Sequence, residues 1–325
     1  MKVIINQNTD PHFNLSVEEY IIKNYDLEED IIMLWRNDKT VVIGRNQNPY
    51  NEVNLEYLKA NDITLARRLS GGGAVYHDLG NLNYTIFTKE KNAFNNYKKF
   101  CMVIIETLKY FGIEANFEGR NDIYIDGAKF SGNAQYFYQD KMFHHGTILF
   151  SVDLNTLSKV LVSKEKYEDK AVKSNKSKVV NLKEINSSIT IEAVIDILIT
   201  KVLKLRKKDL YLLNENELKE VEKIKNERFG LWEWNYGKNF SFQKIKKAKF
   251  KGGTIELTFE VKNGLINNVK VYGDFFGVKT NSDLEELLIN KPYNKDYIGK
   301  LFREEKVDNY FYLITSNEII DLLFE

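Results

Sequence analysis

The spacing of apolar positions divides the first two-thirds of the chain into short strands and amphipathic helices. Compact apolar runs at 31–36 and 40–44 predict strands. Over 94–112 the apolar side chains fall on one helical stripe, and 190–207 shows the same spacing, so both segments are predicted to be helices with one buried face. This part of the chain therefore combines strands with helices.

The last third of the chain is organised around a β-hairpin. Apolar and polar residues alternate over 254–261, Asn263-Gly264 follows, and a second strand pattern covers 265–272. Asn-Gly is a preferred pair for a two-residue type I′ turn, so we expect a hairpin here. Because the composition also shifts near this point, we expect one domain at 1–240 and a smaller α+β domain at 241–325.

Three further helices are predicted from local signals. Ser16 precedes Glu19 by the spacing of a capping box, which predicts a helix that begins at Ser16 and continues to about Tyr25. Helical spacing of apolar residues returns at 282–290 and at 316–324.

Composition narrows the classes of function. The chain has 325 residues, a length that favours two domains, and a net charge of +1 gives no sign of a nucleic-acid or membrane partner. No apolar run approaches the ~20 residues that span a bilayer. The N-terminal residues turn polar too early for a signal peptide, and a single cysteine excludes an intrachain disulfide. We therefore expect a cytoplasmic protein.

The segment from Arg67 to Leu82 carries the strongest chemical signal. Arg67 and Arg68 lead into Ser70 and three consecutive glycines, Gly71 to Gly73. Glycines allow main-chain N–H groups to approach an anion closely, and guanidinium groups suit phosphate or carboxylate. The spacing matches neither the Walker A loop nor the dinucleotide-binding loop. It predicts a different loop that grips a phosphate-bearing ligand.

A second chemical signal is a short hairpin around Asp126-Gly127. In a two-residue turn, Tyr124 lies opposite Lys129 and Asp122 lies opposite Ser131. Residues opposite each other, and residues two apart on one strand, share a face. We therefore expect one patch made of these four side chains. By itself, a lysine beside an aspartate on a sheet is most often a salt bridge.

Four stretches together resemble the lipoate–protein ligase family, in the same order and over nearly the whole chain. They are Trp35-Arg36 with Val42 to Pro49, Arg67 to Leu82, Gly119 to Ala134, and His144 to Leu149. The resemblance implies an α+β fold. The large domain would have the mixed sheet of class II aminoacyl-tRNA synthetases and biotin ligases, and 241–325 would be the small accessory domain of the family.

The resemblance also implies an activity. ATP and lipoate would form lipoyl-AMP and pyrophosphate with Mg²⁺, and the lipoyl group would pass to a lysine of an acceptor protein. The acceptors would be lipoyl domains of 2-oxoacid dehydrogenase E2 subunits or the glycine-cleavage H protein, and we expect a monomer. Two alternatives remain open: an octanoate or biotin ligase on the same scaffold, and a non-catalytic lipoyl-binding protein.

Site residues follow from the resemblance position by position. Lys129 would contact both the lipoate carboxylate and the adenylate phosphate, as the catalytic residue. Asp122 would either orient Lys129 or hold Mg²⁺. The nucleotide and lipoyl-AMP set is Arg68, Ser70, Gly73, Ala74, Val75, Tyr76, His77, Asn81, Asn121, Asp122, Lys129 and Thr147. The lipoate-pocket set is Arg45, Gly72, Gly73, Lys129 and His145.

Strand parity separates the two adjacent histidines. His144 and His145 point to opposite faces of an apolar strand, so only His145 can share a face with Thr147. We expect His145 and Thr147 to shape the pocket, although a satisfied buried histidine is the commoner outcome for either. Cys101 falls on the apolar stripe of the 94–112 helix, so we expect it in the core and not as a thioester nucleophile.

The lysine-rich stretch at 172–182 matches the family segment that closes over adenine. Lys176 and Lys178 stand where the family usually has arginines, which keeps the charge and loses the bidentate geometry. On its composition alone, the stretch is also typical of a solvated loop.

Overall fold

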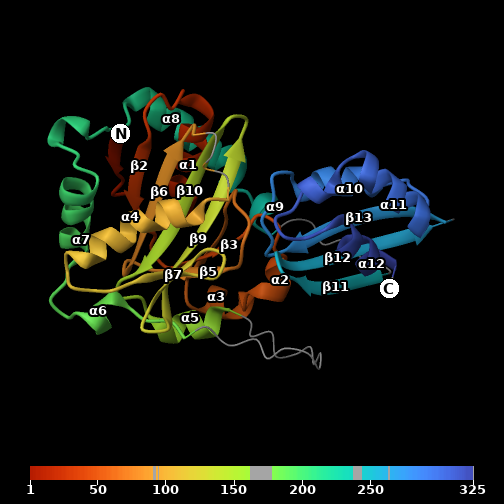
Figure 1. The fold of residues 1–325 in the computed structure, drawn as a ribbon, viewed down its shortest axis with the longest axis horizontal. Helices are drawn as coiled ribbons and strands as arrows, with labels where there is room; N and C mark the ends of the chain where they lie inside the picture. Colours follow the sequence, from red (N-terminus) through yellow and green to blue (C-terminus); the bar gives the residue numbers. More distant parts are fainter. Residues whose placement is uncertain (91–92, 94, 162–177, 237–243, 263, 325) are drawn as a thin grey trace.

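A mixed seven-stranded sheet is the centre of the larger part of the molecule (Figure 1). The computed structural model describes the chain apart from residues 91–92, 94, 162–177, 237–243, 263 and 325. In spatial order the strands are β1 (Lys2–Ile5), β2 (Ile31–Trp35), β6 (Asn81–Thr88), β10 (Lys141–Leu149), β9 (Ala128–Tyr138), β8 (Asp122–Ile125) and β7 (Asn116–Glu118). Only β1 and β2 run parallel; the other neighbours are antiparallel. The mixed sheet agrees with the expected fold class.

Helices cover both faces of this sheet. On one face lie α1 (Pro11–Asn24) and α8 (Glu215–Ile224), which share a buried cluster with alternate residues of the strands. On the other face lie α4 (Tyr97–Lys109) and α7 (Ile191–Ile197), with their own cluster. The helices predicted at 94–112 and 190–207 are thus present, and a π-helical turn (Leu198–Val202) extends α7.

The start of α1 differs from the sequence prediction. The helix begins at Pro11, not at Ser16, because Asp10 caps it by accepting a hydrogen bond from the His12 N–H at 2.9 Å. Proline is favoured in the first turn of a helix, where its missing N–H costs nothing. Ser16 lies inside the helix and donates its hydroxyl to the His12 carbonyl at 2.7 Å.

A three-stranded sheet lies beside the large one and has a separate core. Its spatial order is β4 (Thr64–Arg67), β3 (Thr40–Ile43) and β5 (Val75–His77). The helices α3 (Leu55–Ala60) and α5 (Leu154–Val160) share its buried cluster, and α2 (Pro49–Glu52) comes between β3 and α3 in the chain. The triple-glycine loop connects β4 to β5, so both of its ends are fixed by strands that pair with β3.

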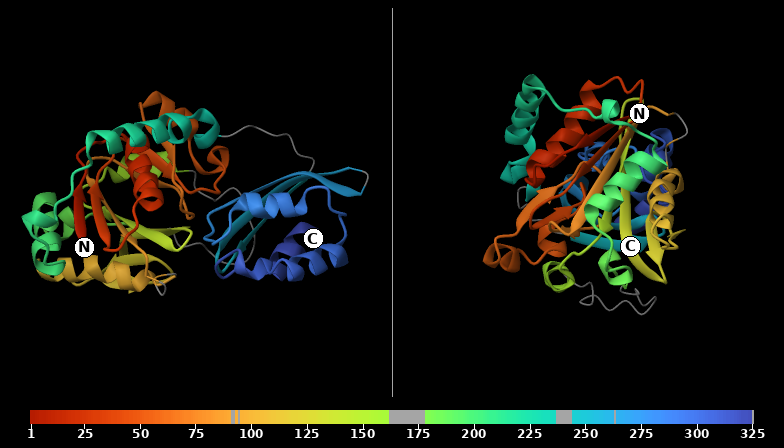
Figure 2. Two further views of the ribbon diagram at one scale, coloured as in Figure 1. Left: turned by 90° about the horizontal axis from the view of Figure 1, so that it is seen from above. Right: turned by 90° about the vertical axis from the view of Figure 1, so that its left-hand side faces the viewer.

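The C-terminal part is an antiparallel sheet with helices on one face (Figure 2). After α9 (Trp232–Asn235), the elements are β11 (Lys244–Phe250), β12 (Gly253–Lys262), β13 (Leu265–Gly273), α10 (Asn281–Leu288), α11 (Lys295–Glu304) and α12 (Ser316–Phe324). The predicted hairpin is present as β12 and β13. Gly264 has a φ of +77°, as its turn requires, and Asn263 lies outside the described residues.

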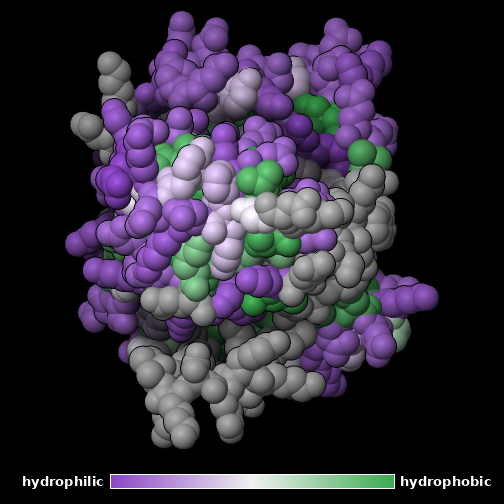
Figure 3. All heavy atoms as spheres, turned by 90° about the vertical axis from the view of Figure 1, so that its right-hand side faces the viewer, coloured by the Kyte–Doolittle hydropathy of each residue, from purple (hydrophilic) through white to green (hydrophobic). Residues whose placement is uncertain are grey.

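The outer surface of this part is largely hydrophilic, with Ile245, Leu265, Val278, Tyr297 and Leu313 as its exposed large apolar side chains among the described residues. Viewed from its own end, hydrophilic side chains cover much of the visible face, with smaller groups of hydrophobic ones between them (Figure 3). The helices expected at 282–290 and 316–324 correspond to α10 and α12, whereas α11 was not predicted. Among the described residues, no helix is long and apolar enough to cross a bilayer.

Candidate active site

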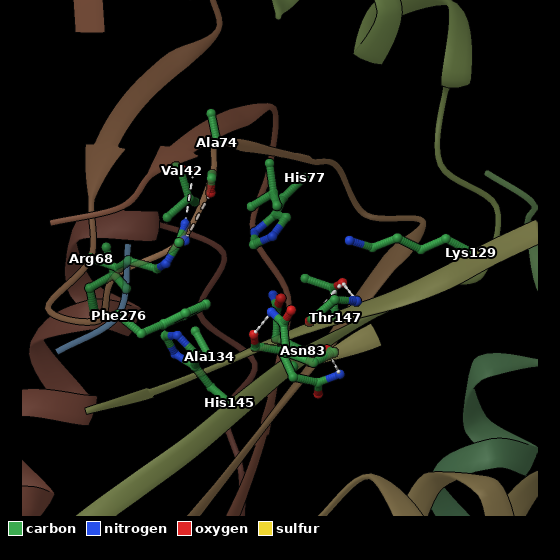
Figure 4. A pocket seen from close by; sticks show the side chains of 18 of the residues that line it. Val42, Arg68, Ala74, His77, Asn83, Lys129, Ala134, His145, Thr147 and Phe276 are labelled. Atoms are coloured by element: carbon green, nitrogen blue, oxygen red, sulfur yellow. Dashed lines mark hydrogen bonds between the residues drawn. The ribbon is translucent and has the colours of Figure 1, made fainter. Parts of the chain in front are cut away.

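A pocket lies where the two sheets of the larger part meet the C-terminal part (Figure 4). The strands β9 and β10 supply one wall, and the triple-glycine loop supplies the other. The lining residues are Leu15, Trp35, Val42, Arg68, Gly72, Gly73, Ala74, Val75, His77, Asn83, Asn121, Lys129, Gly132, Asn133, Ala134, His145, Gly146, Thr147 and Phe276. The fold therefore brings residues from motifs that are far apart in the sequence to one cavity.

Arg68 holds the glycine loop in shape. Its Nη2 donates to the carbonyls of Gly71 and Gly73, both at 2.8 Å, and its Nε donates to Ser70 Oγ at 3.0 Å. A further bond from Nη1 reaches the Val42 carbonyl at 3.2 Å. Burial lowers the pKa of Arg68 to about 10, which leaves the group charged at neutral pH. The guanidinium thus adds a fixed positive charge beside the pocket while its N–H groups bond to the protein.

Arg67 also donates its N–H groups to main-chain carbonyls, but those of other segments. Its Nη1 donates to the carbonyls of Gly44, Arg45 and Gln47, the shortest of these bonds being 2.6 Å. Its Nε and Nη2 donate to the carbonyls of Trp234 and Asn235 at 2.8 and 2.9 Å. The arginine therefore ties β4 to α9, the last described helix before the C-terminal sheet.

The hairpin of β8 and β9 positions Lys129 as predicted. Lys129 lies opposite Tyr124, and its Nζ is 2.8 Å from Asp122 Oδ1. The predicted pairing of Asp122 with Ser131 is wrong: Asp122 lies opposite Gly132, because a β-bulge adds one residue to β9. Ser131 consequently leaves the pocket face, and it is buried.

The bulge has a direct consequence for the lysine. It keeps Gly132 on the pocket face beside Lys129, although the two are three residues apart. A Cβ on Gly132 would lie 3.2 Å from both Cε and Nζ of Lys129. The absence of a side chain at Gly132 therefore makes room for the ammonium group.

The main chain of Lys129 is also held by hydrogen bonds to the segment 178–180. Its N–H donates to the Lys178 carbonyl at 2.7 Å, and its carbonyl accepts from the Val180 N–H at 3.0 Å. The predicted adenine-closing stretch at 172–182 thus reaches the site at its described end. Lys176 and the rest of 172–177 lie outside the described residues.

Two buried donors in the pocket have no hydrogen-bond partner among the described residues. Asn37 accepts from Asn14 through Oδ1 and so presents its Nδ2 to His77 Nδ1 at 3.1 Å. This arrangement places the ring proton of His77 on Nε2, which is unpaired. Burial lowers the pKa of His77 to about 3, so the ring is neutral. The second unpaired donor is Asn83 Nδ2, whose own Oδ1 accepts from Asn81.

The two histidines of β10 occupy opposite faces, as parity predicted. His145 lines the pocket; its Nδ1 is 2.9 Å from Glu18 Oε1 and its Nε2 is 2.7 Å from Ser70 Oγ. His144 lies behind the sheet and stacks on Phe100 with 4.9 Å between ring centroids. Burial holds the pKa of His144 well below its ordinary value.

Several residues of the two predicted sets do not line the pocket. Tyr76 belongs to the core under the three-stranded sheet, and Arg45 is half-buried beside the loop. Three others lie behind the lining and bond to a residue that lines the pocket. Ser70 bonds to Arg68, Asn81 bonds to Asn83, and Asp122 pairs with Lys129. The remaining members are at the pocket: Arg68, Gly72, Gly73, Ala74, Val75, His77, Asn121, Lys129, His145 and Thr147.

Three large apolar residues of the lining were missing from the predicted sets. Leu15, Trp35 and Phe276 line the pocket from α1, β2 and the loop after β13. Their sequence signal is that of ordinary core residues, so only the fold reveals them. Cys101 is buried in the core as expected, and burial raises the pKa of its thiol to about 12.

Carboxylates at the site are sparse. No group of three or more His, Cys, Asp or Glu side chains suited to a metal ion occurs among the described residues. Asp122 lies beside the pocket with its side chain 21% exposed, and one of its oxygens is paired with Lys129. A single carboxylate is compatible with Mg²⁺ only where substrate phosphates and water supply the other ligands.

Comparisons with known proteins agree on one family. The model of the lipoyl protein ligase A/B catalytic domain matches residues 10–203, and that of the bacterial lipoate protein ligase C-terminus matches 239–323. Lipoate-protein ligase LplJ of Bacillus subtilis is 39% identical, with all of both chains covered. Lipoate–protein ligase 1 of Staphylococcus aureus is 37% identical over 99% of this chain and 100% of its own.

Solved structures point the same way. Plasmodium falciparum LipL1, solved in complex with lipoate, has a TM-score of 0.82 and 34% identity, over 93% of this chain and 94% of its own. A lipoate-protein ligase A bound with ATP has a TM-score of 0.63 and 25% identity, over 73% of this chain and 98% of its own. The Thermoplasma acidophilum bipartite lipoate protein ligase, from a structural analysis that includes its E2 lipoyl domain, has a TM-score of 0.64 and 28% identity. The match covers 75% of this chain and 98% of its own. The chain belongs to the lipoate–protein ligase family.

Proposed function

We propose that the protein joins free lipoate to a lysine of an acceptor protein in two steps. A carboxylate oxygen of lipoate attacks the α-phosphorus of ATP, which gives lipoyl-AMP and releases pyrophosphate. The amine of the acceptor lysine then attacks the carbonyl carbon, loses a proton, and expels AMP. Relatives named as lipoate ligases, one structure with lipoate and one with ATP support this proposal.

The observation that carries the proposal is the set of donors on residues that line the cavity. The Nε2–H of His77 and the Nδ2 of Asn83 are buried and unpaired among the described residues, and Lys129 adds an ammonium group. Leaving a buried donor unpaired costs about 1–3 kcal/mol, so such donors favour a ligand rich in acceptor oxygens. An acyl-adenylate has a phosphate, a carbonyl and a ribose, and so meets this requirement.

In the proposal, Lys129 acts where the carboxylate meets the phosphate. Its three donor hydrogens allow one ammonium group to contact an oxygen on each side of the forming bond. Gly73 to Val75 of the loop line the same cavity, and their main-chain amides would suit the phosphate. Negative charge that grows on these oxygens during the reaction is thereby stabilised by groups already in position.

Mg²⁺ would be held chiefly by the ATP phosphates, with Asp122 as a carboxylate beside them. It would neutralise phosphate charge when bound. The observed contact of Asp122 with Lys129 favours orientation of the lysine as the carboxylate's main task. The acceptors in the proposal are lipoyl domains of 2-oxoacid dehydrogenase E2 subunits or the glycine-cleavage H protein, and the ligase is proposed to act as a monomer.

The direct test is to incubate the protein with ATP, Mg²⁺ and lipoate and to look for bound lipoyl-AMP by native mass spectrometry. Pyrophosphate exchange with lipoate, octanoate and biotin, each offered alone, then identifies the acid. Exchange with lipoate supports the proposal. Exchange with only octanoate or only biotin would replace lipoate as substrate, and no exchange with any acid would favour a binding protein without catalysis.

A further inference from the structure

Phe276 is the contribution of the C-terminal part to the pocket wall. It follows β13, at a distance in sequence from every other lining residue, and is only 4% exposed. Each of the other described lining residues belongs to the larger part of the chain. A side chain that reaches a pocket from a separate folding unit can set the size of that pocket independently of the catalytic groups.

The ring of Phe276 is held on three sides. It packs on the glycine loop, where a Cβ on Gly72 would lie 3.1 Å from the ring Cζ. Its centroid is 4.4 Å from the Arg120 guanidinium carbon and 5.8 Å from the Tyr97 ring. Arg120 also donates to the Gly252 carbonyl of the C-terminal part. The ring is therefore a fixed wall in this arrangement, not a side chain free to swing aside.

The wall is at the end of the pocket away from the lysine. In Figure 4, Lys129 and Thr147 lie at one side of the cavity, whereas Phe276 lies at the other with Arg68, Ala134 and His145. Because the N–H groups of Arg68 and both ring nitrogens of His145 already have partners, this end offers few unpaired polar atoms. An acid whose carboxylate meets Lys129 would extend its chain toward Phe276.

We propose that Phe276 limits the length of the acyl chain that the ligase accepts. The inference rests on the proposed function, and it adds that selectivity for the acid is set partly from the C-terminal part. In this arrangement the ring stops the distal end of the chain. A smaller side chain at this position opens the slot, and a larger one shortens it.

The test is the chain-length profile of acid activation, measured as kcat/KM in pyrophosphate exchange with hexanoate, octanoate, lipoate and dodecanoate. For Phe276→Ala we expect the dodecanoate-to-octanoate ratio to rise at least about tenfold over the parent, because even one methylene in an apolar pocket changes selectivity by 10- to 200-fold. For Phe276→Trp we expect lipoate to lose at least about tenfold relative to hexanoate. Phe276→Leu gives a milder cavity should the alanine variant fold poorly.

Val278→Ala is the matched control, because Val278 lies two residues after Phe276, is 53% exposed and does not line the pocket. We expect it to keep the chain-length profile of the parent. If the Phe276 variants change kcat/KM for all acids evenly, or leave the profile unchanged, Phe276 only joins the two parts and the inference fails. Absence of exchange in the parent with every acid would instead sink the proposed function.

Discussion

The two cationic regions of the site are built on opposite principles. Arg67 and Arg68 are buried, and their N–H groups bond to main-chain carbonyls and to Ser70. Lys129 has its side chain 29% exposed, with one ion pair, to Asp122. In the sequence all three look like ligands for an anion. The fold engages the N–H groups of both arginines with the protein itself and leaves the lysine at the wall of the cavity.

The contrast teaches that charge in a motif does not identify the group that contacts the ligand. Arginine has five donor hydrogens in a fixed fork, which suits it to bind several carbonyls of a tight loop at once. Lysine has a flexible stem and fewer geometric demands, so it can change partners during a reaction. The comparison predicts that substitutions of the lysine affect rate and that substitutions of the arginines affect stability.

The largest expected effect is on the rate of Lys129→Ala. Removing one preorganised donor from a site of developing charge costs about 10²–10³ in rate. We expect a loss of that size in kcat for lipoylation with the melting temperature nearly unchanged, measured beside Lys201→Ala, an exposed lysine on the π-helical turn after α7. A Lys129→Ala enzyme within a factor of three of the parent would contradict the assigned role.

For Arg68→Ala we expect the free energy of unfolding to fall by about 3 kcal/mol, because the Gly71 and Gly73 carbonyls lose their shared donor. Urea denaturation measures this change. If stability stays within about 0.5 kcal/mol of the parent while KM for ATP rises more than tenfold, Arg68 contacts the nucleotide and the contrast with Lys129 breaks down.

Asp122→Asn separates the two tasks proposed for this carboxylate. With Lys129 no longer held by an ion pair, we expect about a tenfold fall in kcat through misplacement of the ammonium group. The Mg²⁺ concentration that gives half the maximal rate should stay the same. A rise of several-fold in that concentration would show that Asp122 is a metal ligand.

The smallest effect concerns His77, the neutral donor between the two regions. Its pKa is 6.5 in an unfolded chain and falls to about 3 on burial, so between these values the unfolded chain binds a proton that the folded chain does not. Stability from this residue is therefore complete above pH 6.5 and is lost as the pH falls. For His77→Asn we expect a slope of stability against pH that is flatter by up to about 1.4 kcal/mol per pH unit.

Equilibrium unfolding at pH 7.0, 6.0 and 5.0 measures that slope. The buried His144 contributes equally in the parent and the variant, so the difference isolates His77. Equal slopes would mean that His77 binds a proton in the folded protein as readily as in the unfolded chain.

Sequence reasoning succeeded where local geometry decides the outcome. The Asp126-Gly127 turn fixed the pairing of Tyr124 with Lys129, and strand parity separated His145 from His144. It failed where one extra residue in a strand shifts the pairing register: the bulge in β9 moved Ser131 off the pocket face. Backbone bulges depend on packing from both sides of a sheet, which periodicity does not report.

The apolar side of the site could not be predicted for a different reason. Trp35 and Phe276 have the pattern of core residues, and it is the meeting of separate elements that makes them pocket walls. Likewise, the carbonyls that accept hydrogen bonds from Arg67 belong to residues 44–47 and to α9. These two segments are so far apart in the sequence that no motif contains both.

The pairing of Lys129 with residues 178–180 restricts how this protein can vary in evolution. The segment between Leu161 and Lys178 starts next to a bridge to Val53 and ends at the bridge beside the lysine. A single deletion at 178–180 would change which residues bond to the main chain of Lys129, so this short segment should tolerate substitutions but not changes of length.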